Sequence, residues 1–245
     1  MILDVLTILL LTTLAGACIP LGGYLASFER ILPRWLDREF RHFTIAFGGG
    51  ILLGAVAFVL VPEGVESMDG SLLSIPVLLA GGFTFFLIER ALGLRRRESP
   101  QLMGMVLDYV PEAIALGGLM ALGSPVAPLL ALLIGMQNLP EGFNAYRELC
   151  TQYKSPHKTL LVMRGLVVIG PLAGLSGYFL LGDHPMILGL IMLFSSGGIL
   201  YLLFQDIAPQ SRLKNHWAPP LGSVFGFCLV LYSQMLLILR AKHGF

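Results

Sequence analysis

Two short motifs place acidic and amide side chains within otherwise apolar sequence. They read DYVPE and QNLPE, and each has a polar residue four positions before a glutamate: Asp108 before Glu112, and Gln137 before Glu141. Residues four apart lie on the same face of a helix, so each pair should form one polar patch on its own helix. Carboxylate and amide oxygens are ligands that hard divalent cations prefer. The spacing therefore predicts a cation site shared by two helices.

The sequence around these motifs is too apolar for a water-soluble protein. Of the 245 residues, 56% are hydrophobic and 13% are charged, whereas soluble domains carry about 25% charged residues. Eight apolar stretches each approach the ~20 residues that cross a bilayer; they cover residues 2–25, 43–62, 72–93, 102–123, 126–147, 159–181, 186–209 and 219–239. We therefore expect an all-α integral membrane protein with eight transmembrane helices, forming a single transmembrane domain over residues 1–245.

The basic residues lie almost entirely at alternate connections between these stretches. Fourteen of the 16 Lys and Arg residues fall in connections around residues 30–41, 90–97, 147–164 and 212–214. Cytoplasmic loops carry an excess of Lys and Arg, so we expect these connections to be cytoplasmic and both termini to be extracytoplasmic. The expected location is the cell (inner) membrane, as a multi-pass protein.

A faint internal repeat relates the second and seventh stretches. Residues 48–63 read GGGILLGAVAFVLVPE and residues 196–210 read SGGILYLLFQDIAPQ. In the expected orientation these two helices run in opposite directions. The similarity predicts inverted repeats, spans 1–3 against spans 6–8, around the central pair 4–5 that carries the acidic motifs.

Placing the acids of the two motifs at their expected depth in the bilayer has a high free-energy cost. A carboxylate near the bilayer centre costs roughly 2.5–3.5 kcal/mol, and Asp108, Glu112 and Glu141 have no Lys or Arg in either helix core to pair with. Like charges brought together must protonate or bind a cation. Pro111 and Pro140 each free the carbonyl four residues earlier, which adds oxygen ligands. The alternative is that each motif forms a kink with a protonated acid that only packs helices, and two motifs in consecutive helices favour the cation site.

The motifs resemble those of one transporter family. The paired PE motifs, the eight spans with both ends outside and the FQDIAP end of the seventh span are similar to the ZIP (Zrt/Irt-like) divalent-metal transporters. That family reads HNxPEG in the fourth span and a His- or Gln-led PE motif in the fifth. The resemblance implies a metal ligand set that reads, in this sequence, Asp108, Glu112, Gln137, Asn138 and Glu141.

The sequence also departs from the family pattern. Asp108 stands where the family has histidine, and Tyr109 stands where it has asparagine. The Glu-Pro that helps to hold a second metal in the family reads Gly170-Pro171 here, so a second, bridged metal is not expected. Glu63 at the outer end of the second span and Asp206 near the cytoplasmic end of the seventh are candidates for the ion pathway, as is Tyr109; an ordinary helix-end charge is the alternative for both acids.

These observations lead to a transporter as the expected function. The substrate is expected to be a divalent metal of the zinc, manganese or iron class, or cadmium, moved into the cytoplasm by alternating access, with no organic cofactor. The alternative is a non-transporting sensor or scaffold relative with a decayed site. An intramembrane hydrolase is disfavoured because no histidine lies in a span core, so the chain is not expected to be an enzyme. The lipid bilayer is an expected partner. Nucleic acid is not an expected partner, because the chain has a net charge of only +1. The sequence leaves open whether the protein forms a homodimer.

Overall fold

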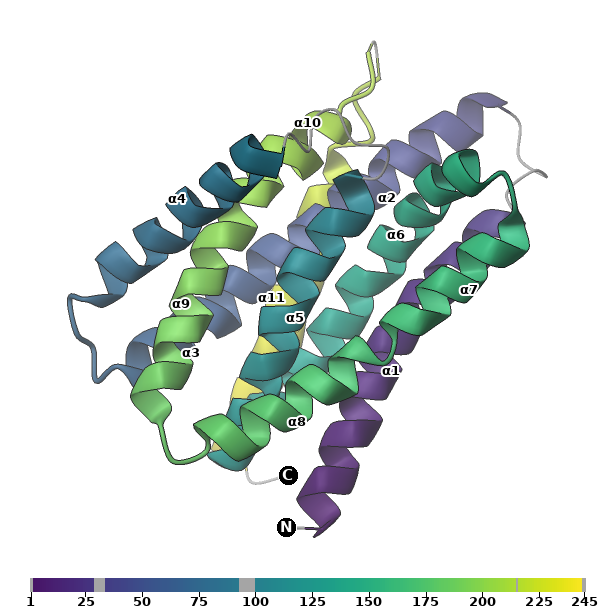
Figure 1. Ribbon diagram of the computed structural model, residues 1–245. Coiled ribbons are helices and arrows are strands. Elements are labelled where there is room, and N and C mark those ends of the chain that lie inside the picture. Colours follow the sequence, from purple (N-terminus) through teal and green to yellow (C-terminus); the bar gives the residue numbers. More distant parts are fainter. Residues whose placement is uncertain (1, 29–33, 93–99, 215, 244–245) are drawn as a thin grey trace.

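The computed structural model describes residues 2–28, 34–92, 100–214 and 216–243, and within them the fold is all-helical. The first half comprises α1 (Ile2–Ser27), α2 (Arg34–Ala55), the π-helical segment η2 (Val56–Leu60), α3 (Val61–Ser67), α4 (Ser74–Leu92), α5 (Pro100–Ala121) and α6 (Ala127–Tyr153). The second half comprises α7 (Pro156–Leu166), α8 (Ile169–Leu181), α9 (Pro185–Leu202), the π-helical segment η4 (Leu203–Ile207), α10 (Ala208–Gln210) and α11 (Leu221–His243). The long helices form one bundle, and α1 begins at the end of the bundle where α11 ends (Figure 1).

Seven helical segments among the described residues are long and apolar enough to cross a membrane. They cover Ile2–Ser27, Glu39–Ser67, Ser74–Ala91, Gly104–Ala121, Pro156–Leu181, Pro185–Gln210 and Leu221–Arg240. Helix α6 occupies the place of the remaining predicted span; it has 27 residues, but its second half is rich in polar side chains. The predicted multi-pass, all-helical membrane protein is supported at this level. Arg30 and the arginines at 95–97, which contributed to the expected orientation, lie outside the described residues.

Several helices extend beyond the apolar stretches that predicted them. Helix α2 begins at Arg34 rather than at residue 43, and α6 continues to Tyr153 rather than ending at 147. Apolar sequence marks the part of a helix that faces hydrocarbon, whereas the backbone hydrogen bonds continue into the interfacial region. The second and seventh spans each contain a π-helical segment, and the sixth is divided into α7 and α8.

The distribution of side chains is the reverse of that in a water-soluble domain. Large apolar residues are exposed along the outer faces of the helices, including Leu79, Phe83, Leu172 and Phe179, each more than 60% exposed. A group of seven carboxylate and amide side chains instead lies buried inside the bundle. An apolar exterior of this extent is stable when lipid covers it.

Glycines bring the helices together in four close pairs. In the α4–α9 pair, a Cβ built on Gly81 would lie 1.8 Å from the carbonyl oxygen of Phe194, and one built on Gly197 would lie 1.9 Å from that of Leu78. Each helix therefore presents a glycine to the backbone of the other. Small residues at such crossings allow close backbone approach, which is the main source of packing energy between helices in lipid.

The other three pairs use the same device. In the α5–α8 pair, Gly117 faces the carbonyl of Gly174, and Gly177 faces that of Ile114. In α1–α6, the glycines are Gly22 and Gly142; in α2–α11, they are Gly50, Gly222 and Gly226. In all these cases the added Cβ would lie 1.9–2.4 Å from a backbone oxygen of the partner helix. The backbone, rather than a flexible side chain, occupies the space, so a larger residue must separate the helices.

We expect Gly81→Ala to destabilise the folded protein, because its methyl group would overlap the carbonyl of Phe194. Overpacking of this kind costs about 1–3 kcal/mol. Gly104→Ala in α5 is the matched control, since no described atom lies within 4 Å of the position of its Cβ. Thermal unfolding in detergent should show a lower Tm for Gly81→Ala alone. An unchanged Tm would show that the α4–α9 crossing is not tightly packed.

Candidate metal-binding site

The two acidic motifs lie on α5 and α6, which pack against each other in the bundle. All five predicted ligands are buried, with side chains between 0% and 6% exposed: Asp108, Glu112, Gln137, Asn138 and Glu141. A sixth polar residue, Asn144 on α6, is equally buried. The structure thus gathers the predicted residues inside the protein rather than on its lipid-facing surface.

The amide groups of this cluster use their nitrogens in hydrogen bonds within the protein. Gln137 Nε2 donates to Glu112 Oε2, which joins the two motifs directly. Asn138 Nδ2 donates to the carbonyl of Ala15 on α1 at 3.0 Å. Asn144 Nδ2 donates to the carbonyl of Pro140 at 2.9 Å. Each bond fixes the orientation of an amide group and leaves its oxygen for another partner.

Most side-chain oxygens of the cluster are without hydrogen-bond donors. Nine buried side-chain nitrogens or oxygens among the described residues have no partner, and seven of them belong to this cluster. The seven are Asp108 Oδ1, Glu112 Oε1, Gln137 Oε1, Asn138 Oδ1, both carboxylate oxygens of Glu141 and Asn144 Oδ1. All seven are acceptors. An unsatisfied buried polar group costs about 1–3 kcal/mol, and more when it is charged, so this cluster calls for a cation or for protons.

Electrostatic repulsion acts among the three carboxylates. Asp108 interacts with the charges of Glu141 and Glu112, and Glu141 also interacts with Glu112. Across the described residues, no three His, Cys, Asp or Glu side chains converge closely enough to hold a metal ion by themselves. The donor set assembled on α5 and α6 is therefore a mixture of carboxylate and amide oxygens.

Two small cavities meet at Glu141. The first, of about 20 Å³, is lined by Met105, Asp108, Glu141, Asp206 and Gln210, among others. The second, of about 10 Å³, lies between Glu141, Asn144 and the Gly48-Gly49 turn of α2. A volume of about 10–15 Å³ holds one water molecule, so each cavity has room for about one small ion or water.

Asp206 reaches the first cavity from a π-helical segment. It lies in η4, whose extra residue per turn departs from the α-helical register, and π-bulges of this kind are frequent at functional sites. The candidate pathway residue therefore shares a cavity with Asp108 and Glu141. Glu63 does not, because it lies in α3 and accepts a hydrogen bond at 3.2 Å from Ser124, in the turn between α5 and α6.

The hydroxyl of Tyr109 is directed toward α1 and α8. It donates to the carbonyl of Thr12 at 3.3 Å, and it lies only 1.9 Å from the position of a Cβ built on Gly170. Any side chain at position 170 would overlap the phenol. The two departures from the family pattern, at positions 109 and 170, thus occupy the same space, with the ring of one filling the room left by the other.

Two features of the interior were not predicted from the sequence. Asn144 follows Glu141 by three residues, and residues three or four apart share a helix face, so its position beside Glu141 could have been predicted. Glu89 on α4 is buried and accepts hydrogen bonds from Tyr201 and, at 3.2 Å, from Gln205. Nothing in the sequence around Glu89 indicates its contacts with Tyr201 and Gln205, because both residues lie more than 100 positions away.

No protein-family model matches this chain, and no curated protein matches it either. Function is therefore inferred from the chemistry of the site.

The Tyr109–Gly170 contact can be tested by a double-mutant cycle. We expect Gly170→Ala to destabilise the protein by about 1–3 kcal/mol through overlap with the phenol. In a Tyr109→Phe background the cost should be smaller, because the nearest obstacles become the ring carbon and the carbonyl oxygen of Thr12, both at 2.9 Å. Unfolding free energies of the four variants would give the interaction term. Additive effects would mean that the two residues do not share this space.

Proposed function

We propose that this protein transports a divalent metal ion of the zinc, manganese or iron class across the membrane, with the ion bound between α5 and α6. The observation that carries the proposal is the set of seven buried oxygens without hydrogen-bond donors. A divalent cation can satisfy several of them at once, and it also offsets the repulsion among Asp108, Glu112 and Glu141.

The donor set bears on which metals would bind. It contains carboxylate and amide oxygens and no imidazole or thiolate. Such a set suits hard ions such as Mn²⁺, while affinity still rises toward zinc along the divalent series. The similarity of the DYVPE and QNLPE motifs to those of ZIP transporters supports the same class of substrate, with Asp108 in the position of the family's histidine.

The surroundings of the site support release toward the cytoplasmic side. The cavity at Glu141 is also lined by Asp206 and Gln210, which lie at the end of the seventh span that is expected to be cytoplasmic. On the other side, the parts of α5 and α6 that lead to their connecting turn contain fully buried apolar residues, including Leu116, Leu130 and Leu133. Alternating access would open this second side and close the first.

The glycine-mediated pairs support two groups of helices that move against each other. Helices α1, α5, α6 and α8 are joined by the α1–α6 and α5–α8 pairs. Hydrogen bonds from Tyr109 and Asn138 to backbone carbonyls of α1 also connect them. Helices α2, α4, α9 and α11 form the other two pairs. The first group carries the candidate ligands, and the second would act as the scaffold.

The same pairs are consistent with inverted repeats. Exchanging spans 1–3 with spans 6–8, and α5 with α6, converts the α1–α6 pair into α8–α5 and the α2–α11 pair into α9–α4. The two π-helical segments, η2 and η4, lie in spans that this exchange relates, and each is followed by a proline two residues later. Repeats of this kind underlie alternating access in many transporters.

Uptake by proteoliposomes tests the proposal. Glu112→Gln and Glu141→Gln keep the shape of each side chain but remove a charge, so each should slow Mn²⁺ or Zn²⁺ uptake by at least about tenfold, given that even outer-shell changes cost roughly 10–100-fold in metal affinity. Glu66→Gln, at an exposed position of α3, should have no effect. Near-normal uptake by either site variant would contradict the assignment and favour a structural kink.

Metal binding separates transport from the sensor or scaffold alternative. A protein that binds Mn²⁺ or Zn²⁺ in detergent, but gives no uptake in proteoliposomes, would support the alternative. Loss of binding in both site variants, together with uptake by the wild type, is the result expected from a transporter.

The proposed orientation can be tested by labelling in intact cells. In a background without the three native cysteines, Ser71→Cys should react with an impermeant thiol reagent, because it lies in an exposed turn expected to face outward. His157→Cys, exposed at the start of α7, should be protected until the membrane is permeabilised. The reverse pattern would invert the topology.

A further inference from the structure

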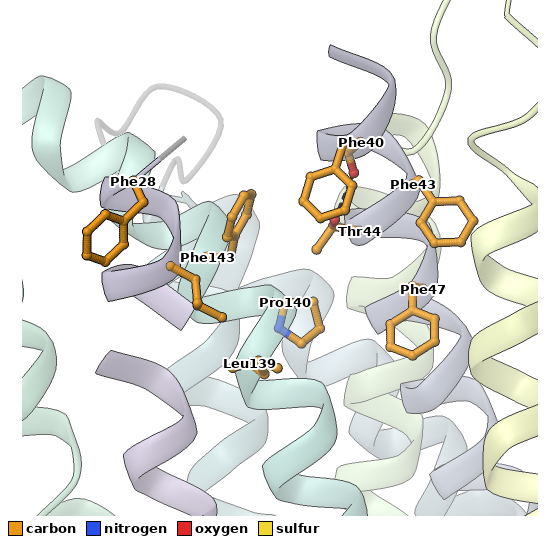
Figure 2. A pocket seen from close by; sticks show the side chains of 9 residues that line it. Phe28, Phe40, Phe43, Thr44, Phe47, Leu139, Pro140 and Phe143 are labelled. Atoms are coloured by element: carbon orange, nitrogen blue, oxygen red, sulfur yellow. Dashed lines mark hydrogen bonds between the residues drawn. The ribbon is translucent and has the colours of Figure 1, made fainter. Parts of the chain in front are cut away.

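A large apolar cavity lies away from the acidic cluster, between the end of α1, the first half of α2 and the middle of α6. It has a volume of about 470 Å³, which is within the range of ligand pockets. Five phenylalanines line it, and Figure 2 shows them around Pro140: Phe28, Phe40, Phe43, Phe47 and Phe143. Pro140 immediately precedes Glu141, so one wall of this pocket is the helix segment that carries the candidate metal ligand.

The described lining of the pocket is almost entirely apolar. Among the described lining residues, Thr44 alone has a polar side chain, and its hydroxyl donates to the carbonyl of Phe40 at 2.7 Å. The other contacts are aromatic or aliphatic. The matching occupant is hydrocarbon, because a polar group placed here would lose its hydrogen bonds to water without replacement.

The pocket opens toward the surface that lipid covers. Three of its residues are about half exposed: Leu25, Phe28 and Phe40, at 48%, 52% and 45%. These residues lie in or beside helices that are long and apolar enough to span a bilayer. The nearest hydrocarbon is therefore a phospholipid acyl chain, which can enter from the side without crossing a polar region.

A positive charge lies at one edge of the pocket. The guanidinium carbon of Arg147 is 5.2 Å from the ring centroid of Phe143, one helical turn further along α6. This places the arginine beyond the apolar lining, on the side of the bundle where the basic connections gather. Basic groups between transmembrane helices on the cytoplasmic side attract anionic headgroups, and arginine matches phosphate geometry well.

We infer that an anionic phospholipid occupies this pocket, with an acyl chain against the five phenylalanines and its phosphate at Arg147. The inference goes beyond metal transport and does not depend on it. The lipid fills space beside Pro140, which also lines the small cavity at Glu141, so it would support α6 next to the carboxylate cluster.

Lipid retention tests this inference directly. The purified protein is equilibrated with phosphatidylglycerol and phosphatidylcholine, exchanged into lipid-free detergent and examined by native mass spectrometry. We expect one retained lipid per chain, with phosphatidylglycerol favoured. Thr44→Trp, which places a ring in the pocket, should reduce retention at least fivefold, whereas Leu79→Trp on the lipid-facing side of α4 should not. Wild-type retention by Thr44→Trp, or no retained lipid in the wild type, would overturn the pocket assignment.

Substitution of Arg147 tests the contact with the lipid headgroup. Arg147→Gln should remove the preference for phosphatidylglycerol over phosphatidylcholine and leave total retention largely intact. Arg164→Gln, at an exposed site on α7, should keep the preference. A preference unchanged by Arg147→Gln would overturn the headgroup assignment.

A fluorescence measurement covers the case in which Thr44→Trp fails to fold. Trp35 and Trp217 are replaced by Phe, and a single tryptophan is introduced as Phe143→Trp in the pocket or as Leu79→Trp outside it. One equivalent of phosphatidylglycerol with brominated acyl chains in detergent should quench the pocket reporter several-fold more. Equal quenching of the two reporters would contradict the inference.

Discussion

The cost of an oxygen atom without a hydrogen-bond donor inside a membrane governs the organisation of this protein. Water is absent at that depth, so each buried acceptor needs a donor from the protein or a cation. Within the described cluster on α5 and α6, three amide groups act as donors, and these bind Glu112 and two backbone carbonyls. Seven acceptors remain. A cluster with so many unpaired acceptors is poorly suited to stabilising an empty fold but well suited to binding a cation.

Close backbone packing is the second requirement, because lipid gives helices no hydrophobic reason to associate. The four glycine-mediated pairs achieve this packing because the glycines have no side chain between the two backbones. The bundle is therefore packed more tightly within these pairs than between them. Contacts within a pair are made backbone to backbone, whereas the contact of α2 with α6 leaves both the small cavity at Glu141 and the large apolar pocket beside Pro140. In the proposed transport cycle, this boundary with its cavities is where one group of helices would shift against the other.

Much of this architecture is visible in the sequence, because the bilayer imposes a simple rule on span length and apolarity. The positions of the spans and the burial of Asp108, Glu112 and Glu141 follow from that rule. Helix ends do not, since α2 and α6 continue past the hydrocarbon. The π-helical segments are also invisible locally, as they depend on how η2 and η4 pack. Asn144 could have been found from its spacing, but the Glu89–Tyr201 contact required the tertiary structure.

The pair formed by Tyr109 and Gly170 shows why a site should not be transferred from a motif one residue at a time. Position 109 follows an acid of the cluster in sequence, yet its phenol contacts α1 and α8 because Gly170 leaves the space open. A carboxylate at 170 and a tyrosine at 109 cannot occupy that space together. The ring of Tyr109 instead joins α5 to α1 and α8. The seven oxygens without hydrogen-bond donors lie on α5 and α6, and the contact of Tyr109 with Thr12 joins α5 to α1.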